Sequence, residues 1–215
     1  MSDALKKPII SILLIFVLGI AADQGTKQWA QHSLLSDSFH QNDSNFPVCG
    51  NPDQEMTRAR FVYTNAEPKT VVNNMFRFRY VENCASAFNL MGNLPEGFRF
   101  PFFLIISILA CVVIPFMFFK TPNDQRLMLY ALPFILTGAL GNLLDRMFFR
   151  YVIDFIDWYV VLGGKEYHWP TFNIADAAIV IGIALMILQI LLTDKKKESS
   201  SSEHEKKLKE EPVSK

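Results

Sequence analysis

Four long runs of apolar residues alternate with polar segments along this chain of 215 residues. The runs are almost free of charge and cover residues 8–22, 100–119, 127–144 and 172–192. An α-helix rises ~1.5 Å per residue, so about 20 apolar residues cross the ~30 Å hydrocarbon core of a bilayer. The pattern predicts an all-α membrane protein with four transmembrane helices.

The first run has a second interpretation. It follows Lys6 and Lys7 and ends in small residues near Ala21, an arrangement that is also typical of a cleavable signal peptide. Helical propensity nevertheless continues past Asp23 to Trp29, which favours a first span that ends at an aqueous interface.

The polar segments predict a small β element outside the membrane. Residues 34–75 are rich in Ser, Asn, Asp and Pro, which is typical of a loop. Within and after this segment, TRARFVYTN (57–65) and MFRFRYVEN (75–83) alternate apolar and polar residues, as strands do. We therefore expect an extramembrane loop with a small sheet within residues 34–99. Residues 147–171 are expected to form a surface loop with its aromatic side chains at the headgroup layer.

Charge distribution predicts the orientation. The chain has 21 basic and 21 acidic residues, so no net field favours a nucleic-acid partner. With four spans, the basic residues near the helix ends all fall on one side, which the positive-inside rule makes cytoplasmic: Lys6, Lys7, Lys120, Arg126 and Lys195 to Lys197. Both termini are then cytoplasmic. Residues 1–193 form the membrane domain, and residues 194–215 form a charged, disordered cytoplasmic tail.

Four aspartates lie around the boundary between the last two runs: Asp145, Asp154, Asp157 and Asp176. Carboxylates beside hydrocarbon are expensive to desolvate, so each is a candidate for function. Simpler explanations also exist. Asp176 can interact with a helix N-terminus capped by Asn173, Asp145 can pair with Arg146, and Asp157 can be a solvated interfacial acid. Asp154 lies in an apolar stretch and requires a partner.

Two carboxylates that share a site hold one proton between them, because both cannot easily ionise. Such a pair supplies a base that activates water and an acid that polarises a carbonyl. Asn142 and Asn173 can align the acids or donate to an oxyanion.

A small proton-coupled transporter would also use paired acids. It would need polar residues deep along several helices, whereas here they gather at the outer helix ends. A membrane receptor is a third possibility.

The sequence offers little support for a cysteine or serine nucleophile or for a metal site. Cys49, Cys84 and Cys111 lack CxxC spacing, so they predict neither a zinc site nor a disulfide scaffold. Cys84 has no histidine in a recognised cysteine-protease context, and Ser86 lacks a nucleophile-elbow pattern. The sequence leaves open whether Cys49 and Cys84 form a disulfide.

Five motifs occur in a fixed order at the predicted helix ends. They are Asp23-Gln24 followed by Lys27, then NCASAF (83–88), GALGNLLDR (138–146), VIDFID (152–157) and FNIAD (172–176). Together they resemble the motif set of the lipoprotein signal peptidase family, signal peptidase II. The resemblance covers roughly residues 8–193.

The resemblance implies an intramembrane aspartyl endopeptidase. Members of this family cleave bacterial prolipoproteins just before a diacylglyceryl-modified cysteine, without a metal or organic cofactor. By motif, Asp154 and Asp176 would be the catalytic pair. Asn83, Asn142, Arg146 and Asn173 would bind or orient substrate, and Asp23, Lys27 and Asp145 would support structure or contact lipid nearby.

The family further implies a small sheet that cradles the substrate, an inner-membrane location and an active site at the outer leaflet. The expected partners are the lipid-modified prolipoprotein and membrane lipids, and we expect a monomer. The chain departs from the family at two places. Ala85 stands where the family usually has glycine, and residues 38–70 form an insertion for which the sequence predicts no function.

Overall fold

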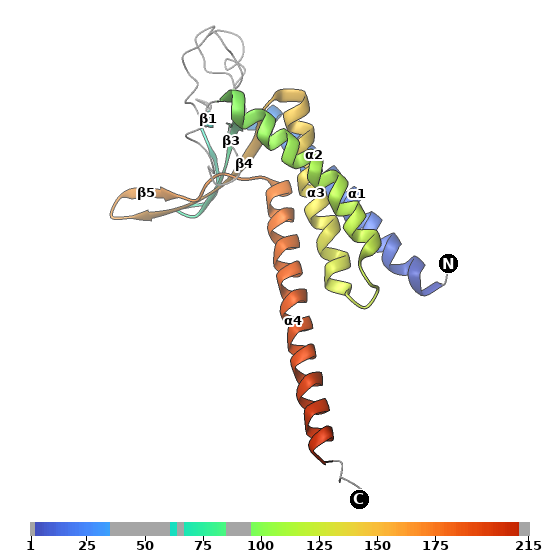
Figure 1. Cartoon of the computed structure of the whole chain (residues 1–215). Helices are drawn as coiled ribbons and strands as arrows, with labels where there is room; N and C mark the ends of the chain where they lie inside the picture. The colour runs from blue at the N-terminus through green and yellow to red at the C-terminus, as the bar shows by residue number, and fades with distance from the viewer. Residues whose placement is uncertain (1–2, 35–60, 64–66, 85–95, 211–215) are drawn as a thin grey trace, which may run out of the picture.

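The computed structural model describes residues 3–34, 61–63, 67–84 and 96–210. These residues form four helices and five strands in the order α1 (Asp3–Leu34), β1 (Phe61–Tyr63), β2 (Lys69–Val72), β3 (Phe76–Asn83), α2 (Glu96–Lys120), α3 (Arg126–Phe149), β4 (Val152–Leu162), β5 (Lys165–His168) and α4 (Ile174–Glu210). The helices pack around α3, α4 diverges from the others toward its C-terminus, and the strands gather at the opposite end of the molecule (Figure 1).

Each helix contains a stretch that is long and apolar enough to cross a membrane. The four stretches are Ile9–Leu34, Phe100–Lys120, Arg126–Phe149 and Ile174–Asp194. The outward-facing side chains of three helices are large and apolar, for example Val17 on α1, Val112 on α2 and Ile187 on α4. Such surfaces suit lipid tails and are unfavourable in water. The chain is therefore an integral membrane protein, as the sequence predicts.

Helix α3 is the centre of the bundle and packs against α1, α2 and α4. Its contact with α4 depends on Gly138: a Cβ atom there would meet the carbonyl oxygen of Ala175 at 2.2 Å. Because a glycine lets two helix backbones approach closely, α3 can hold the first turn of α4 against its own surface. This contact brings Asn142 on α3 level with Asp176 on α4.

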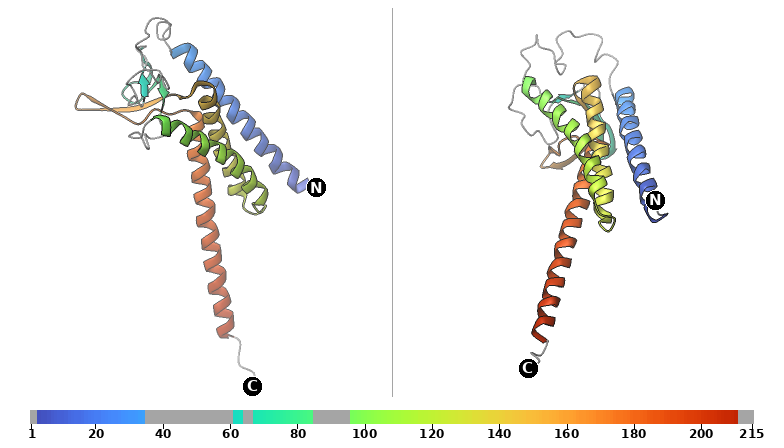
Figure 2. Two further views of the ribbon diagram at one scale, coloured as in Figure 1. Left: turned by 45° about the horizontal axis from the view of Figure 1, so that its top comes forward. Right: turned by 45° about the vertical axis from the view of Figure 1, so that its right-hand side comes forward.

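The strands form an antiparallel sheet in the order β1-β3-β4-β5, and β2 also pairs with β3. Gly163 and Gly164 join β4 to β5, with φ angles of 59° and 78°. Two consecutive residues with positive φ are what the common two-residue hairpin turn requires. The hairpin projects sideways from the helices (Figure 1), and two further orientations show the sheet at the same end of the bundle (Figure 2).

The sheet is anchored on the end of α1. Ala30 and Leu34 of α1 form a buried apolar cluster with Tyr80, Tyr151, Ile153 and Phe155. Trp29 adds an edge-to-face contact with Phe78, with ring centroids 5.1 Å apart. Apolar packing thus fixes the strand β4, which carries Asp154, relative to the transmembrane helices.

The structure differs from the sequence-based expectation at several elements. Strand β3 lies where predicted, and β1 falls inside the predicted segment 57–65, the rest of which lies outside the described residues. The expectation that residues 147–171 form a loop is wrong, because they contain β4 and β5. The first four residues of β4 are all buried, so this half lacks the alternation that reveals a strand.

Helix α4 continues to Glu210, past the end of the predicted span at residue 192. That residues 194–215 form a cytoplasmic tail separate from the membrane domain remains a prediction. Ala85 and most of the insertion 38–70 lie outside the described residues. Cys84 is disulfide-bonded, Cys111 is free, and Cys49 lies outside the described residues.

The close approach of α3 and α4 predicts that Gly138→Ala destabilises the protein. The added methyl group must push α4 away, and overpacking of this kind costs about 1–3 kcal/mol. Gly25→Ala is the matched control, because a Cβ atom at Gly25 meets nothing within 4 Å. Thermal unfolding of the purified variants in detergent should show a lower midpoint for Gly138→Ala only. Equal midpoints would mean that α3 and α4 do not need this contact.

Candidate active site

Asp154 is completely buried at the start of β4, where the sheet meets the helices. Each of its carboxylate oxygens accepts a hydrogen bond from a side-chain amide. The Nδ2 atom of Asn83 donates to Oδ2 at 2.8 Å, and the Nδ2 atom of Asn173 donates to Oδ1 at 2.8 Å. Asn83 ends β3, the antiparallel neighbour of β4, and Asn173 precedes α4. Three elements therefore meet at this one carboxylate.

Asp176 lies in the first turn of α4. Its backbone N–H donates to Oδ1 of Asn173 at 2.9 Å, so Asn173 caps the helix as the sequence predicts. On its other side, Asn142 of α3 donates from Nδ2 to Oδ1 of Asp176 at 2.8 Å. Helix capping therefore explains why this acid occurs here, and the contact with Asn142 directs its carboxylate toward the interior of the site.

The two aspartates belong to one hydrogen-bonded group. Asn173, which donates to Asp154, also donates from Nδ2 to Oδ1 of Asn142 at 3.2 Å, and Asn142 donates to Asp176. Burial raises the pKa of Asp154 well above its usual range, and the neighbouring carboxylate of Asp176 raises it further. A pair whose members oppose each other's ionisation shares one proton.

A cavity of about 290 Å³ opens beside the pair, between α2, α3 and α4. Its polar end is formed by Asn83, Asn142, Arg146 and Asp176, and the remainder includes Phe103, Ile106, Ala110, Ile135 and Ile179. The cavity thus combines an apolar lining, suited to a hydrocarbon chain or an apolar peptide, with Asp176 and the two amides that hold the acids at its polar end. Arg146 is held in place by donating to the carbonyl oxygen of Asn142 at 3.1 Å.

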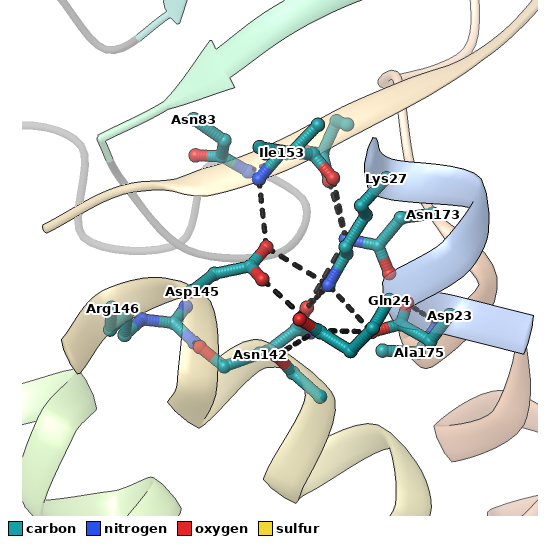
Figure 3. A network of polar contacts seen from close by, with 12 residues as sticks. Asp23, Gln24, Lys27, Asn83, Asn142, Asp145, Arg146, Ile153, Asn173 and Ala175 are labelled. Atoms are coloured by element: carbon teal, nitrogen blue, oxygen red, sulfur yellow. Dashed lines mark hydrogen bonds and ion pairs between the residues drawn. The ribbon is translucent and has the colours of Figure 1, made fainter. Parts of the chain in front are cut away.

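Behind the pair lies a buried group of opposite charges. The side chains of Asp23, Lys27 and Asp145 are at most 2% exposed, and Lys27 contacts both carboxylates, at 2.9 Å to Asp23 and 3.0 Å to Asp145. Gln24 donates to both acids as well, at 3.0 Å and 3.2 Å. Figure 3 shows this network together with Asn142, Asn173 and Asn83. All nine site residues that the family resemblance implies therefore lie in or next to one cluster.

Asp157, the fourth aspartate, belongs to a different group. Its carboxylate accepts from Nε of Arg77 at 2.7 Å and contacts Nδ1 of His168 at 2.9 Å. Arg77 also pairs with Glu166 of β5 at 3.0 Å. These contacts hold the hairpin against β3. The alternation in FRFRY placed Arg77 on one face of a strand, but without the β4–β5 register it could not identify these partners.

The sequence analysis also missed the apolar side of the cavity. Phe103, Ile106 and Ala110 look like any other residues of a transmembrane helix, and no sequence signal distinguishes a cavity-lining residue from a lipid-facing one. Only the separation of α2 from α4 reveals their role. For Cys84, the disulfide rules out a free thiol nucleophile.

The fold and the site define a four-span membrane protein with two carboxylates paired at one end of its helices. Residues 15–192 match the family model described as signal peptidase (SPase) II, and the chain belongs to this family. A lipoprotein signal peptidase of Geobacter sulfurreducens is 40% identical over 125 residues, which cover 58% of this chain and 74% of that protein. One of Alteromonas mediterranea is 46% identical over 113 residues, covering 53% and 59%.

Solved structures agree with the family. A bacterial membrane enzyme determined by the in meso method at 2.3 Å resolution aligns with a TM-score of 0.61 at 25% identity, covering 88% of this chain and 92% of that one. A second, at 1.9 Å resolution, gives a TM-score of 0.58 at 25% identity and covers 85% and 94%. The named relatives are peptidases, and none of these comparisons supports the transporter alternative.

Proposed function

We propose that this protein is an aspartyl endopeptidase that removes signal peptides from diacylglyceryl-modified bacterial prolipoproteins by cleaving just before the lipidated cysteine. The observation that carries the proposal is the Asp154–Asp176 pair, which is joined through Asn173 and Asn142 and whose Asp176 lines a largely apolar cavity. Family membership and the names of the relatives support a peptidase that acts on prolipoproteins.

The mechanism follows from the shared proton. The ionised aspartate takes a proton from water, and the resulting hydroxide attacks the carbonyl carbon of the residue before the cysteine. The protonated aspartate gives its proton to the carbonyl oxygen, which forms a neutral tetrahedral intermediate. The C–N bond then breaks: one acid gives its proton to the cysteine nitrogen, and the other takes a proton from a hydroxyl group of the intermediate, which leaves the pair with one proton again. The products are a signal peptide with a free carboxyl group and a lipoprotein with a free amino group.

The amides serve as fixed donors. Asn83 and Asn173 hold both oxygens of Asp154, and Asn142 holds one oxygen of Asp176, so neither acid needs to reorganise during the reaction. Arg146, at the polar end of the cavity, is positioned to bind backbone carbonyl oxygens of the substrate. The cavity would receive apolar parts of the substrate, which reach it laterally from the bilayer.

We further propose that the protein lies in the bacterial inner membrane with both termini in the cytoplasm and the acids at the outer leaflet. The start of α1, the α2–α3 turn and the end of α4 all lie away from the sheet (Figure 1), as the distribution of basic residues requires. Three aromatic side chains of the hairpin region, Trp158, Tyr167 and Trp169, are exposed and suit the headgroup layer.

The first prediction concerns the acids. Asp154→Asn and Asp176→Asn should each abolish cleavage of a diacylglyceryl-modified prolipoprotein by the purified protein in detergent, with losses on the order of 10⁴-fold or more. Asp157→Asn is the control, because its carboxylate contacts Arg77 and His168 instead of the pair. The folded fraction of the Asp157→Asn protein should still cleave the substrate. If Asp157→Asn lost cleavage while Asp154→Asn and Asp176→Asn retained it, the catalytic role would pass from the proposed pair to Asp157.

The second prediction concerns pH. Activity requires one proton on the pair, so kcat/KM should be bell-shaped, with one limb for each macroscopic ionisation. Since burial and Asp176 raise the pKa of Asp154, cleavage should persist at neutral pH, far above the ordinary aspartate pKa of about 3.9. The measurement is kcat/KM from pH 4 to 10 with folding checked at each pH. A flat profile would contradict a shared proton.

The third prediction concerns the cavity. Ala110→Phe should fill the space beside the acids and reduce kcat/KM by about 10-fold or more, mainly through KM, because the substrate loses room for its apolar part. Val112→Phe is the control on the same helix, since Val112 is 65% exposed on the lipid-facing side. Titration of substrate against each variant measures the effect. Equal losses in both variants would mean that the substrate binds elsewhere.

A further inference from the structure

Lys27 is a buried cation whose three hydrogens all have partners. Its Nζ atom lies 2.9 Å from Oδ2 of Asp23, 3.0 Å from Oδ2 of Asp145 and 3.1 Å from Oδ1 of Asn142. None of these partners is a catalytic acid. We propose that Lys27 is a positioning residue for the Asp154–Asp176 pair and acts on both acids through these three contacts. This inference rests on the proposed function.

The first contact leads to the backbone before Asp176. Asp23 uses its second oxygen, Oδ1, to accept from the backbone N–H of Ala175 at 2.9 Å. Gly141 makes room for this carboxylate, because a Cβ atom there would lie 2.4 Å from Oδ2 of Asp23. Lys27 therefore holds the first turn of α4 through Asp23, one residue from the acid on that helix.

The second contact leads to the backbone before Asp154. Oδ2 of Asp145, the same oxygen that contacts Lys27, accepts from the backbone N–H of Ile153 at 3.0 Å. The carbonyl oxygen of Ile153 in turn accepts from Asn173 at 3.2 Å. Lys27 and Asp145 thus fix the peptide that precedes Asp154, and Figure 3 shows Ile153 and Lys27 approaching Asp145 from two sides.

The third contact determines the orientation of an amide. A side-chain amide has one accepting and one donating end, and the ammonium of Lys27 can only face the accepting end of Asn142. The donating end is thereby directed to Oδ1 of Asp176 at 2.8 Å. A flipped Asn142 would place its oxygen against the carboxylate of Asp176 and its NH₂ group against the ammonium, which both partners disfavour.

A role in stability alone does not require this arrangement. Buried ion pairs are replaceable by apolar side chains of similar volume with little loss of stability. Each of the three partners of Lys27 makes a further hydrogen bond close to an acid. Asp145 binds the backbone one residue before Asp154, Asp23 binds the backbone one residue before Asp176, and Asn142 binds the Asp176 carboxylate itself. Ammonium offers three donors on one compact atom, which the planar guanidinium of arginine does not.

The positive charge of Lys27 also affects the pKa values of the acid pair, and this effect can be measured. The positive charge lowers the pKa of Asp154, opposing burial and the repulsion from Asp176, which are the larger influences. The other buried charged groups on the elements packed around the pair are Asp23 on α1, Arg77 and Glu82 on β3, Asp145 and Arg146 on α3, and Asp157 on β4. Removing the charge of Lys27 should therefore raise both macroscopic pKa values of the pair.

The test compares wild type with Lys27→Met in full-length protein purified in detergent, using a diacylglyceryl-modified prolipoprotein. We expect kcat per folded molecule to fall on the order of 100-fold with KM nearly unchanged, because misplacement of reacting groups affects the chemical step. Both limbs of the kcat/KM profile should move to higher pH. Arg77→Met is the control: it removes another buried cation, away from the pair, and should lower the folded fraction without moving either limb.

A second variant covers the case in which Lys27→Met does not fold. Lys27→Met combined with Asp145→Asn leaves the net charge of the group formed by Asp23, Lys27 and Asp145 unchanged, and Asp23 still accepts from Gln24 and from the N–H of Ala175. The new amide oxygen can still accept from Ile153. Its limbs should stay close to those of wild type, while kcat falls at least about 10-fold with KM retained. Wild-type kcat in this double variant, or unmoved limbs with unchanged kcat per folded molecule in Lys27→Met, would overturn the inference.

Failure of the proposed function is distinguishable from failure of this inference. Titration of the pair can be followed without substrate, as the infrared absorption of a protonated carboxyl group that is lost in Asp154→Asn. If wild type does not cleave but Lys27→Met still moves this titration to higher pH, the peptidase proposal fails and the influence of Lys27 on the pair stands. If wild type cleaves and Lys27→Met moves neither the titration nor the limbs, only the inference fails.

Discussion

Carboxylates buried next to hydrocarbon are the feature on which the rest of this structure depends. Asp23, Asp145 and Asp154 are all nearly or completely inaccessible to solvent, and each would be strongly unfavourable without partners. Several elements supply these partners: α1 contributes an ammonium and the amide of Gln24, β3 and the residue before α4 contribute the amides of Asn83 and Asn173, and the backbone of β4 contributes an N–H group. The sheet sits where it does because β4 must reach these helices.

This requirement links the extramembrane and transmembrane parts. A sheet held only by the apolar cluster around Tyr80 and Ile153 would have freedom to slide over the end of α1. The directional contacts of Asp145 with Ile153, and of Asn173 with Asp154, fix its position along the helix ends. Hydrogen bonds next to hydrocarbon are difficult to exchange for water, so a misplaced strand leaves polar groups unsatisfied.

The glycines of α3 serve the same purpose in the bundle. Gly138 brings α4 close enough for its first turn to reach Asn142, and Gly141 leaves space for the carboxylate of Asp23. Away from this end, the helices are covered by large apolar side chains and α2 stands apart from α4, with the cavity between them. Tight packing thus surrounds the acids, while looser packing beside them provides the space a substrate would occupy.

The sequence by itself determined the four spans, the strand at residues 75–83 and the set of polar residues at the site. Uninterrupted apolar length and the placement of Asp, Asn and Lys at the ends of those runs are local properties, so they are readable from one chain. Asn173 as a helix cap followed in the same way. The choice of Asp154 over Asp157 did not follow from spacing, since both acids lie in one apolar stretch; it came from the family resemblance.

Only the tertiary structure decided which polar groups meet. Lys27 and Asn142 are 115 residues apart in the chain, and Asn83 and Asp154 are 71 apart, so nothing in either local pattern specifies the contact. The first half of β4 was hidden because burial on both faces removes the alternation of a strand. Cavity-lining residues of α2 were hidden because lipid and a substrate cavity select the same apolar side chains. In each case the feature depends on how segments that are distant in the sequence pack together, and this packing exists only in the folded protein.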